Sequence, residues 1–279
     1  MQLPFTAEAF FDVFSRYNDA VWPMQGVLIA LAIVTVFLTF RGRRGDDRWV
    51  SAILAAFWMW MAAAYHLAFF ARVNQAAVLF AAAFTVQSVL FAFLAWRLSG
   101  PAPPAPRRDV AGVLGALIVA YALVGYPALG YVFGHRYPAV PTFGVPCPTT
   151  IFTLGIIVWS RATVPWWLYV VPIGWAAVAT VAATTLGVWE DFGLPVAAIL
   201  TVAVIGTGRT ARGGGRSDAA MRPAVPCHDF RARPDGTSGG GDTTLMQARE
   251  RSAATSSRES THERHLHRTD VRRRCRNRA

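Results

Sequence analysis

The segment "VSAILAAFWMWMAAAYHLAFF", Val50 to Phe70, contains no Asp, Glu, Arg or Lys. A helix of roughly 20 apolar residues crosses the ~30 Å hydrocarbon core of a bilayer. Three other segments have the same length and character: Val21 to Phe40, Ala76 to Trp96 and Val110 to Phe133. Each of the four predicts a membrane-spanning helix.

Three later segments are also apolar, but two of them are shorter. Trp166 to Leu186 has full length, whereas Thr149 to Val164 and Gly193 to Thr207 do not. Hydrophobic residues make up 54% of the chain and charged residues only 15%, which is more apolar than an ordinary soluble domain. We therefore predict an all-α membrane protein, a polytopic bundle of about seven transmembrane helices in contact with the lipid bilayer. A re-entrant fifth segment would reduce the number to six.

Residues 1–20 form a separate N-terminal region. Phe10, Val13, Phe14 and Tyr17 follow the i, i+3, i+4, i+7 spacing of an amphipathic helix, and Thr6 is a candidate N-cap. We expect a short helix that lies at the membrane interface. The transmembrane helical domain then occupies residues 21–207.

Residues 208–279 differ abruptly in composition from the preceding part of the chain. They are rich in arginine, glycine and serine and show no apolar periodicity. Such a segment cannot form a packed core, so we predict a disordered, arginine-rich tail. We expect it to be solvated, with contact to anionic lipid as the alternative that its charge allows; nucleic-acid binding is not expected.

The distribution of arginines predicts the orientation of the bundle. Arginines follow the first, third and fifth predicted spans, whereas the alternate connections hold few, and the last of these carries Glu190 and Asp191. Loops rich in basic residues stay on the cytoplasmic side. We therefore expect the N-terminus outside and the C-terminus in the cytoplasm.

The connection "GHRYPAVPTFGVPCPTT", Gly134 to Thr150, lies at the predicted outer end of the bundle. Its four prolines fix φ, which predicts a rigid loop able to cap a cavity between helices. Most of the unusual polar side chains of the spans and loops gather at the same end. The candidate ligand-binding residues are Tyr65, His66, His135, Arg136, Cys147, Thr149 and Thr150.

Several chemistries fit these residues. His66, His135 and Cys147 are candidate metal ligands, and His66 could also hold haem, relay a proton, or simply bond to a neighbouring helix. The helix start at Pro148 and Thr149 could receive an anion or cap its own amides. A retinal protein is excluded because its Schiff base needs a lysine, and every basic residue here is arginine.

Three blocks of the chain resemble a known family. They are "FFDVFSRYNDAVWP" (Phe10 to Pro23), "WMWMAAAYHLAFFARVN" (Trp58 to Asn74) and "YPALGYVFGHRYPAVPTFGVPCPTTIFTLG" (Tyr126 to Gly155). The resemblance is to the DUF6064 family, uncharacterised bacterial multi-pass membrane proteins, and it covers roughly residues 1–206. It implies an integral protein of the bacterial inner membrane and names no activity, substrate or cofactor.

The sequence therefore favours an outward-facing polar pocket that binds or passes a small solute or ion. Two alternatives stay open. One is a membrane-embedded metal- or haem-binding enzyme that uses His66 and His135. The other is a structural subunit of a membrane complex.

Overall fold

The computed structural model describes residues 5–97, 107–160 and 164–220 of the chain, with side chains up to residue 206. The named elements of the described part are all helices, joined by loops and turns, and Phe143 and Val145 form an isolated bridge in the loop before α7. Six helical stretches are long and apolar enough to cross a bilayer. The protein is thus a multi-pass membrane protein, as its hydropathy predicts.

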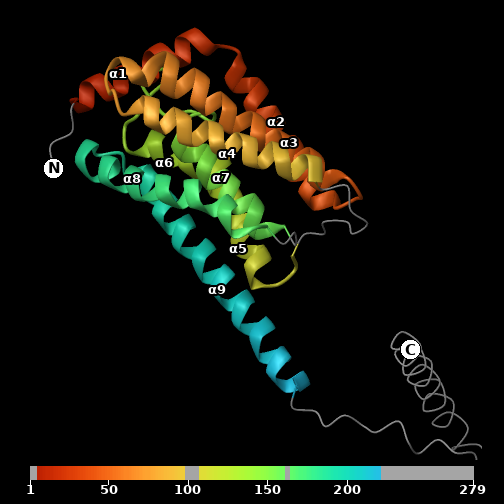
Figure 1. Cartoon of the computed structure of the whole chain (residues 1–279). Coiled ribbons are helices and arrows are strands. Elements are labelled where there is room, and N and C mark those ends of the chain that lie inside the picture. The colour runs from red at the N-terminus through yellow and green to blue at the C-terminus, as the bar shows by residue number, and fades with distance from the viewer. Residues whose placement is uncertain (1–4, 98–106, 161–163, 221–279) are drawn as a thin grey trace, which may run out of the picture. The chain divides into compact units, whose positions relative to one another are not determined.

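The six long stretches are single helices or helices joined end to end (Figure 1). Apart from the C-terminal end of α9, their bounds agree with the predicted spans to within a few residues. The stretches are α2 (Met24–Arg41); α3 (Asp46–Trp60) with η1 (Met61–Phe69) and η2 (Phe70–Arg72); α4 (Ala77–Arg97); α5 (Val110–Ala120) with η3 (Tyr121–Gly125) and α6 (Tyr126–Val132); η4 (Trp166–Tyr169) with α8 (Val170–Leu186); and η5 (Trp189–Phe192) with α9 (Gly193–Ala220). Two of the joints, η1 and η3, are π-helical, and the sequence pattern gives no sign of them.

Large apolar side chains cover the outside of these helices. On α2, for example, Ile33 and Phe37 are 59% and 56% exposed. A water-soluble protein rarely exposes so much apolar surface in one area, whereas lipid tails solvate it without cost. The surface therefore agrees with contact to the bilayer.

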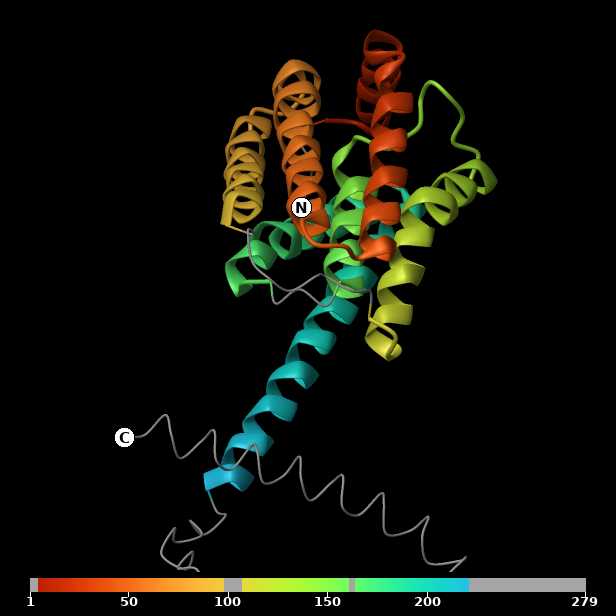
Figure 2. The ribbon, with the colours of Figure 1, turned by 90° about the vertical axis from the view of Figure 1, so that its right-hand side faces the viewer.

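The predicted fifth segment is α7 (Pro146–Trp159), a helix of 14 residues. Every residue of α7 except Cys147 and Trp159 is buried, and Figure 2 shows it (green) between α3 (orange) and α5 (yellow). Its last carbonyl, on Trp159, accepts a hydrogen bond from the backbone nitrogen of Arg107, just before α5 begins. α7 is therefore a short central helix that runs from the loop after α6 back to the start of α5.

Small residues let α5 and α7 approach closely. A Cβ atom at Gly115 would lie 2.4 Å from the backbone nitrogen of Trp159, and one at Gly155 would lie 2.9 Å from the backbone nitrogen of Val119. Glycines at such positions are a common device for packing helices in membranes, where the hydrophobic effect does not drive helices together.

The N-terminal helix α1 (Ala7–Val21) begins with the predicted cap, because the Thr6 hydroxyl accepts from the Ala9 amide at 3.2 Å. Its apolar side chains at Phe10, Val13, Phe14 and Tyr17 are buried as the spacing predicts. They pack against protein, chiefly η1, so that α1 covers one end of the bundle. We call this end, where α1 lies, the α1 end.

The last helix, α9, continues to Ala220. The composition predicts that the tail begins at residue 208, so the helix extends further along the chain than predicted. An existing helix lengthens readily, because each added residue forms one more backbone hydrogen bond. Residues 221–279, most of the predicted disordered tail, lie outside the described part of the chain.

Candidate functional site

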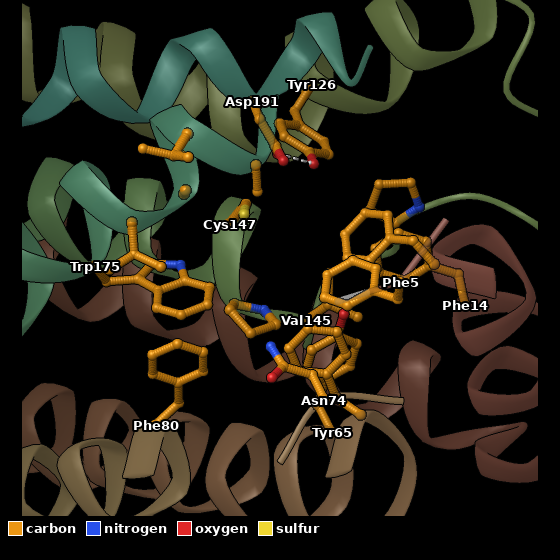
Figure 3. A pocket seen from close by; sticks show the side chains of 18 residues that line it. Phe5, Phe14, Tyr65, Asn74, Phe80, Tyr126, Val145, Cys147, Trp175 and Asp191 are labelled. Carbon is orange, nitrogen blue, oxygen red and sulfur yellow. Dashed lines mark hydrogen bonds between the residues drawn. The ribbon is translucent and has the colours of Figure 1, made fainter. Parts of the chain in front are cut away.

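A cavity of about 270 Å³ lies at the α1 end, between α1, η1, the start of α4, α6, the start of α7, α8 and η5. In Figure 3, Asp191 and Tyr126 lie on one side of it and Phe80, Asn74 and Tyr65 on the opposite side, with Cys147 between them. Most of its wall is aromatic or aliphatic. The lining residues with aromatic rings or polar side-chain atoms include Phe5, Phe14, Tyr65, Asn74, Phe80, Tyr126, Cys147, Trp175 and Asp191.

Two neighbouring carboxylates in the turn η5 are buried beside this cavity. Glu190 is fully buried and Asp191 is 4% exposed. The Tyr126 hydroxyl donates to Asp191 Oδ1 at 2.5 Å, and the Tyr121 hydroxyl donates to the backbone carbonyl of Glu190 at 2.6 Å. The π-helical joint η3 and helix α6 thus position the acidic turn, and Asp191 is the residue of the pair that reaches the cavity.

Glu190 turns away from the cavity toward the proline-rich loop. Its Oε1 lies 2.7 Å from Nδ1 of His135, and the His135 ring lies against Phe11 with a centroid separation of 4.8 Å. Gly130 leaves room for this carboxylate, because a Cβ there would be 3.2 Å from Glu190 Oε1. The pair joins η5 to the loop after α6.

A side chain of α1 holds the proline-rich loop in place. Asn18 of α1 is fully buried, and its amide donates to the carbonyls of Pro138 and Val140 at 2.7 and 2.8 Å. Its Oδ1 accepts from the Thr142 hydroxyl at 2.7 Å. The loop is therefore held by α1 as well as by its own prolines, so the two form one cover over the cavity.

Gly144 completes the turn into α7. Its φ is +106°, and a Cβ there would lie 2.5 Å from a methyl carbon of Leu28. The hydroxyl of Thr149 accepts from the Gly144 amide at 3.0 Å. Thr149 thus holds the preceding loop in place, whereas the sequence left open an anion site or a cap for the amides of its own helix. The helix begins earlier, at Pro146, and this shift places Thr149 beyond the capping position.

His66 lies near the cavity but not in its lining. It is fully buried, and neither ring nitrogen has a hydrogen-bond partner among the described residues. Aromatic rings surround it, the nearest being Phe84, Tyr65 and Trp175 with centroid separations of 4.7, 5.3 and 5.4 Å.

The family model for a family of unknown function, DUF6064, matches residues 7–213, which is most of the chain. The chain belongs to the DUF6064 family. This confirms the resemblance that the three sequence blocks indicate. No curated protein and no solved structure matches the chain.

Of the seven residues that the sequence nominates in this DUF6064 protein, two line the cavity: Tyr65 and Cys147. Thr150 is buried within α7, and Arg136 is exposed, with its guanidinium 3.7 Å from the ring centroid of Tyr131. His66, His135 and Thr149 lie outside the lining, in the surroundings described above. In the described part of the chain, no group of three or more His, Cys, Asp or Glu side chains is placed to hold a metal ion.

Sequence reasoning missed Asp191, Tyr126 and Trp175, which line the cavity of this DUF6064 protein. The signal for the first of them was present. "WEDFGLP" places two adjacent acidic residues directly before an apolar helix. Ionisable residues within the membrane are costly to bury, and they therefore often mark functional sites. In the sequence, Glu190 and Asp191 indicate only a connection on the outer side, because hydropathy does not show whether a turn is buried.

Proposed function

We propose that this DUF6064 protein binds a small, mainly apolar solute in the cavity at the α1 end. The observation that carries the proposal is the cavity itself, because it combines an apolar wall with one convergent carboxylate, the usual composition of a small-molecule site. Arginine distribution favours an α1 end that faces outside. A permease-like role and a sensing role both begin with this binding step.

Size and access support the proposal. A buried apolar cavity of about 150 Å³ is known to hold benzene, so one of 270 Å³ accommodates roughly ten non-hydrogen atoms. Val178 and Val181 line the cavity, yet they are 42% and 44% exposed on α8. The rim therefore reaches the apolar outer surface, and a solute could enter from the lipid side.

Cys147 supplies a reporter inside the cavity. In full-length protein carrying Cys227→Ser and Cys275→Ser, Cys147 is the one remaining thiol. We expect its reaction with methyl methanethiosulfonate, followed by mass spectrometry in lipid nanodiscs, to slow when a fitting solute is present. The probes are benzyl alcohol, benzyltrimethylammonium and phenylacetate, which share a ring and differ in charge.

Two variants of α8 separate filling of the cavity from general effects on the bilayer. Ala182→Trp puts a large side chain into the lining, whereas Ala177→Trp places the same side chain on the exposed face of the same helix. We expect Ala182→Trp to slow the reaction of Cys147 and to abolish protection by any probe. Ala177→Trp should behave as the parent protein. Absence of protection by all three probes in the parent would refute the proposed function.

A further inference from the structure

The carboxylate of Asp191 lacks a positive partner. It is 4% exposed, and no arginine or histidine of the described residues forms an ion pair with it. Its neighbour Glu190, by contrast, has a hydrogen bond to the His135 ring. The Tyr126 hydroxyl donates to Oδ1 of Asp191, and the Cys147 thiol also hydrogen-bonds this carboxyl group, so its partners among the described residues are uncharged side chains.

An unpaired carboxylate in an apolar site is costly, and a bound cation is one way to offset the cost. The start of α7 lies beside it, as Cys147 and Asp191 in Figure 3 show. The positive end of that helix dipole favours the ionised carboxylate over the neutral acid. The carboxyl group of Asp191 thus reaches the cavity without a cationic side chain of the described residues beside it, and a bound cation would stabilise its ionised form.

The wall opposite the carboxylate suits the rest of such a ligand. Phe14 stacks on Tyr65 with a centroid separation of 5.9 Å, and Phe80 meets Trp175 edge to face at 5.3 Å. All four rings line the cavity. Aromatic faces attract cations, especially alkylated ammonium groups whose water shell is weak, and they also cover apolar carbon.

The same end of the bundle is poorly built for an anion. Pro146 and Pro148 occupy the first and third positions of α7 and have no N–H to donate, so the helix start offers few free amides. Arg136, the nearest basic residue along the loop, is exposed and lies over Tyr131. Asp191 would repel an anionic group directly.

We propose that the cavity selects an organic cation, with its apolar body against the aromatic rings and its positive group beside Asp191. This inference rests on the proposed function and narrows it to a ligand class, amines and quaternary ammonium compounds of roughly ten non-hydrogen atoms. Asp191 is the specificity-determining residue, and Tyr126 orients its carboxylate.

The test uses a pair of probes with the same shape and different charge, benzyltrimethylammonium and its neutral carbon analogue neopentylbenzene. Protection of Cys147 is measured as above, in the parent protein and in Asp191→Asn. For each probe, the protection of Cys147 in Asp191→Asn is compared with the protection by the same probe in the parent protein, so that the partition of the probe into the bilayer cancels. We expect Asp191→Asn to weaken benzyltrimethylammonium binding by roughly 10-fold or more and to leave neopentylbenzene unchanged.

Glu190→Gln is the matched control, because it neutralises the adjacent buried carboxylate, which does not line the cavity. It should leave the order of the two probes unchanged. If Asp191→Asn fails to fold, Asp191→Glu keeps the charge and should keep the preference for the cation. In the native chain, phenylacetate should protect least.

The outcomes separate the two proposals. Equal effects of Asp191→Asn on the cationic and the neutral probe would overturn the cation preference and leave solute binding standing. Tighter binding of phenylacetate than of benzyltrimethylammonium would overturn it as well. If no probe protects Cys147 in the parent protein, both proposals fail.

Discussion

Replacing Gly115 with alanine should force α5 and α7 apart. The new methyl carbon would lie 2.4 Å from the backbone nitrogen of Trp159 and 2.7 Å from its Cα. Ordinary contacts begin near 3.4 Å, so the helices must separate by about 1 Å, and backbone atoms cannot swing aside as a flexible side chain can. Overpacking of this kind typically costs about 1–3 kcal/mol.

The assay is thermal unfolding in detergent, with the reaction rate of Cys147 as a second readout. For a chain of this size about 2–4 °C is lost per kcal/mol, so a cost of 2 kcal/mol lowers the midpoint by roughly 4–8 °C. Because α7 carries Cys147 at its start, its displacement should also change the reaction rate of that thiol. Unchanged values of both quantities would refute the packing argument.

Gly26→Ala is the matched control for this prediction. Gly26 also lies within a spanning helix, α2, but no atom lies within 4 Å of the place its Cβ would take. Alanine has the higher helix propensity by about 1 kcal/mol, so the substitution should leave the midpoint unchanged or raise it. A loss equal to that of Gly115→Ala would show that any added methyl group harms the bundle.

Three further predictions concern the α1 end. Burial raises the pKa of Tyr17 to about 12 from about 10 in the unfolded chain, so the free energy of unfolding should be constant up to pH 10 and fall between pH 10 and 12. Tyr17→Phe should make this fall shallower in unfolding titrations. The same substitution leaves the Trp60 indole N–H, which donates to the Tyr17 hydroxyl at 2.7 Å, without its acceptor. His135→Ala should destabilise the protein by about 1–3 kcal/mol in the same assay, because it leaves Oε1 of the buried Glu190 without its hydrogen-bond partner, and a double variant with Glu190→Gln should regain part of that loss. Arg136→Cys, in a chain whose native cysteines are serine, should react with a membrane-impermeant maleimide on intact cells; labelling only after permeabilisation would invert the predicted orientation.

The cavity depends on side chains that no local pattern brings together. Asp191 lies in η5 after α8, Tyr126 is the first residue of α6 and Cys147 is the second residue of α7, yet all three line one cavity. The order and length of the hydrophobic segments place Tyr65 and Cys147 at the same end as the proline-rich loop, as the structure has them. Which polar residues face a shared space depends on the rotation of each helix about its axis, and the two π-helical joints alter this rotation.

The sequence alone determined the membrane class, the bounds of the six long spans, the amphipathic helix α1 with its Thr6 cap, and the family. These follow from composition and from the spacing of apolar residues over a few positions, which are local properties of the chain and do not depend on distant segments. Only the tertiary structure decided that a 14-residue helix fills the centre of the bundle, that Asn18 ties the proline-rich loop to α1, and that Glu190 is paired while Asp191 faces the cavity. The physical reason is that burial and pairing depend on contacts between segments far apart in the chain, and hydropathy records only the average environment of each segment.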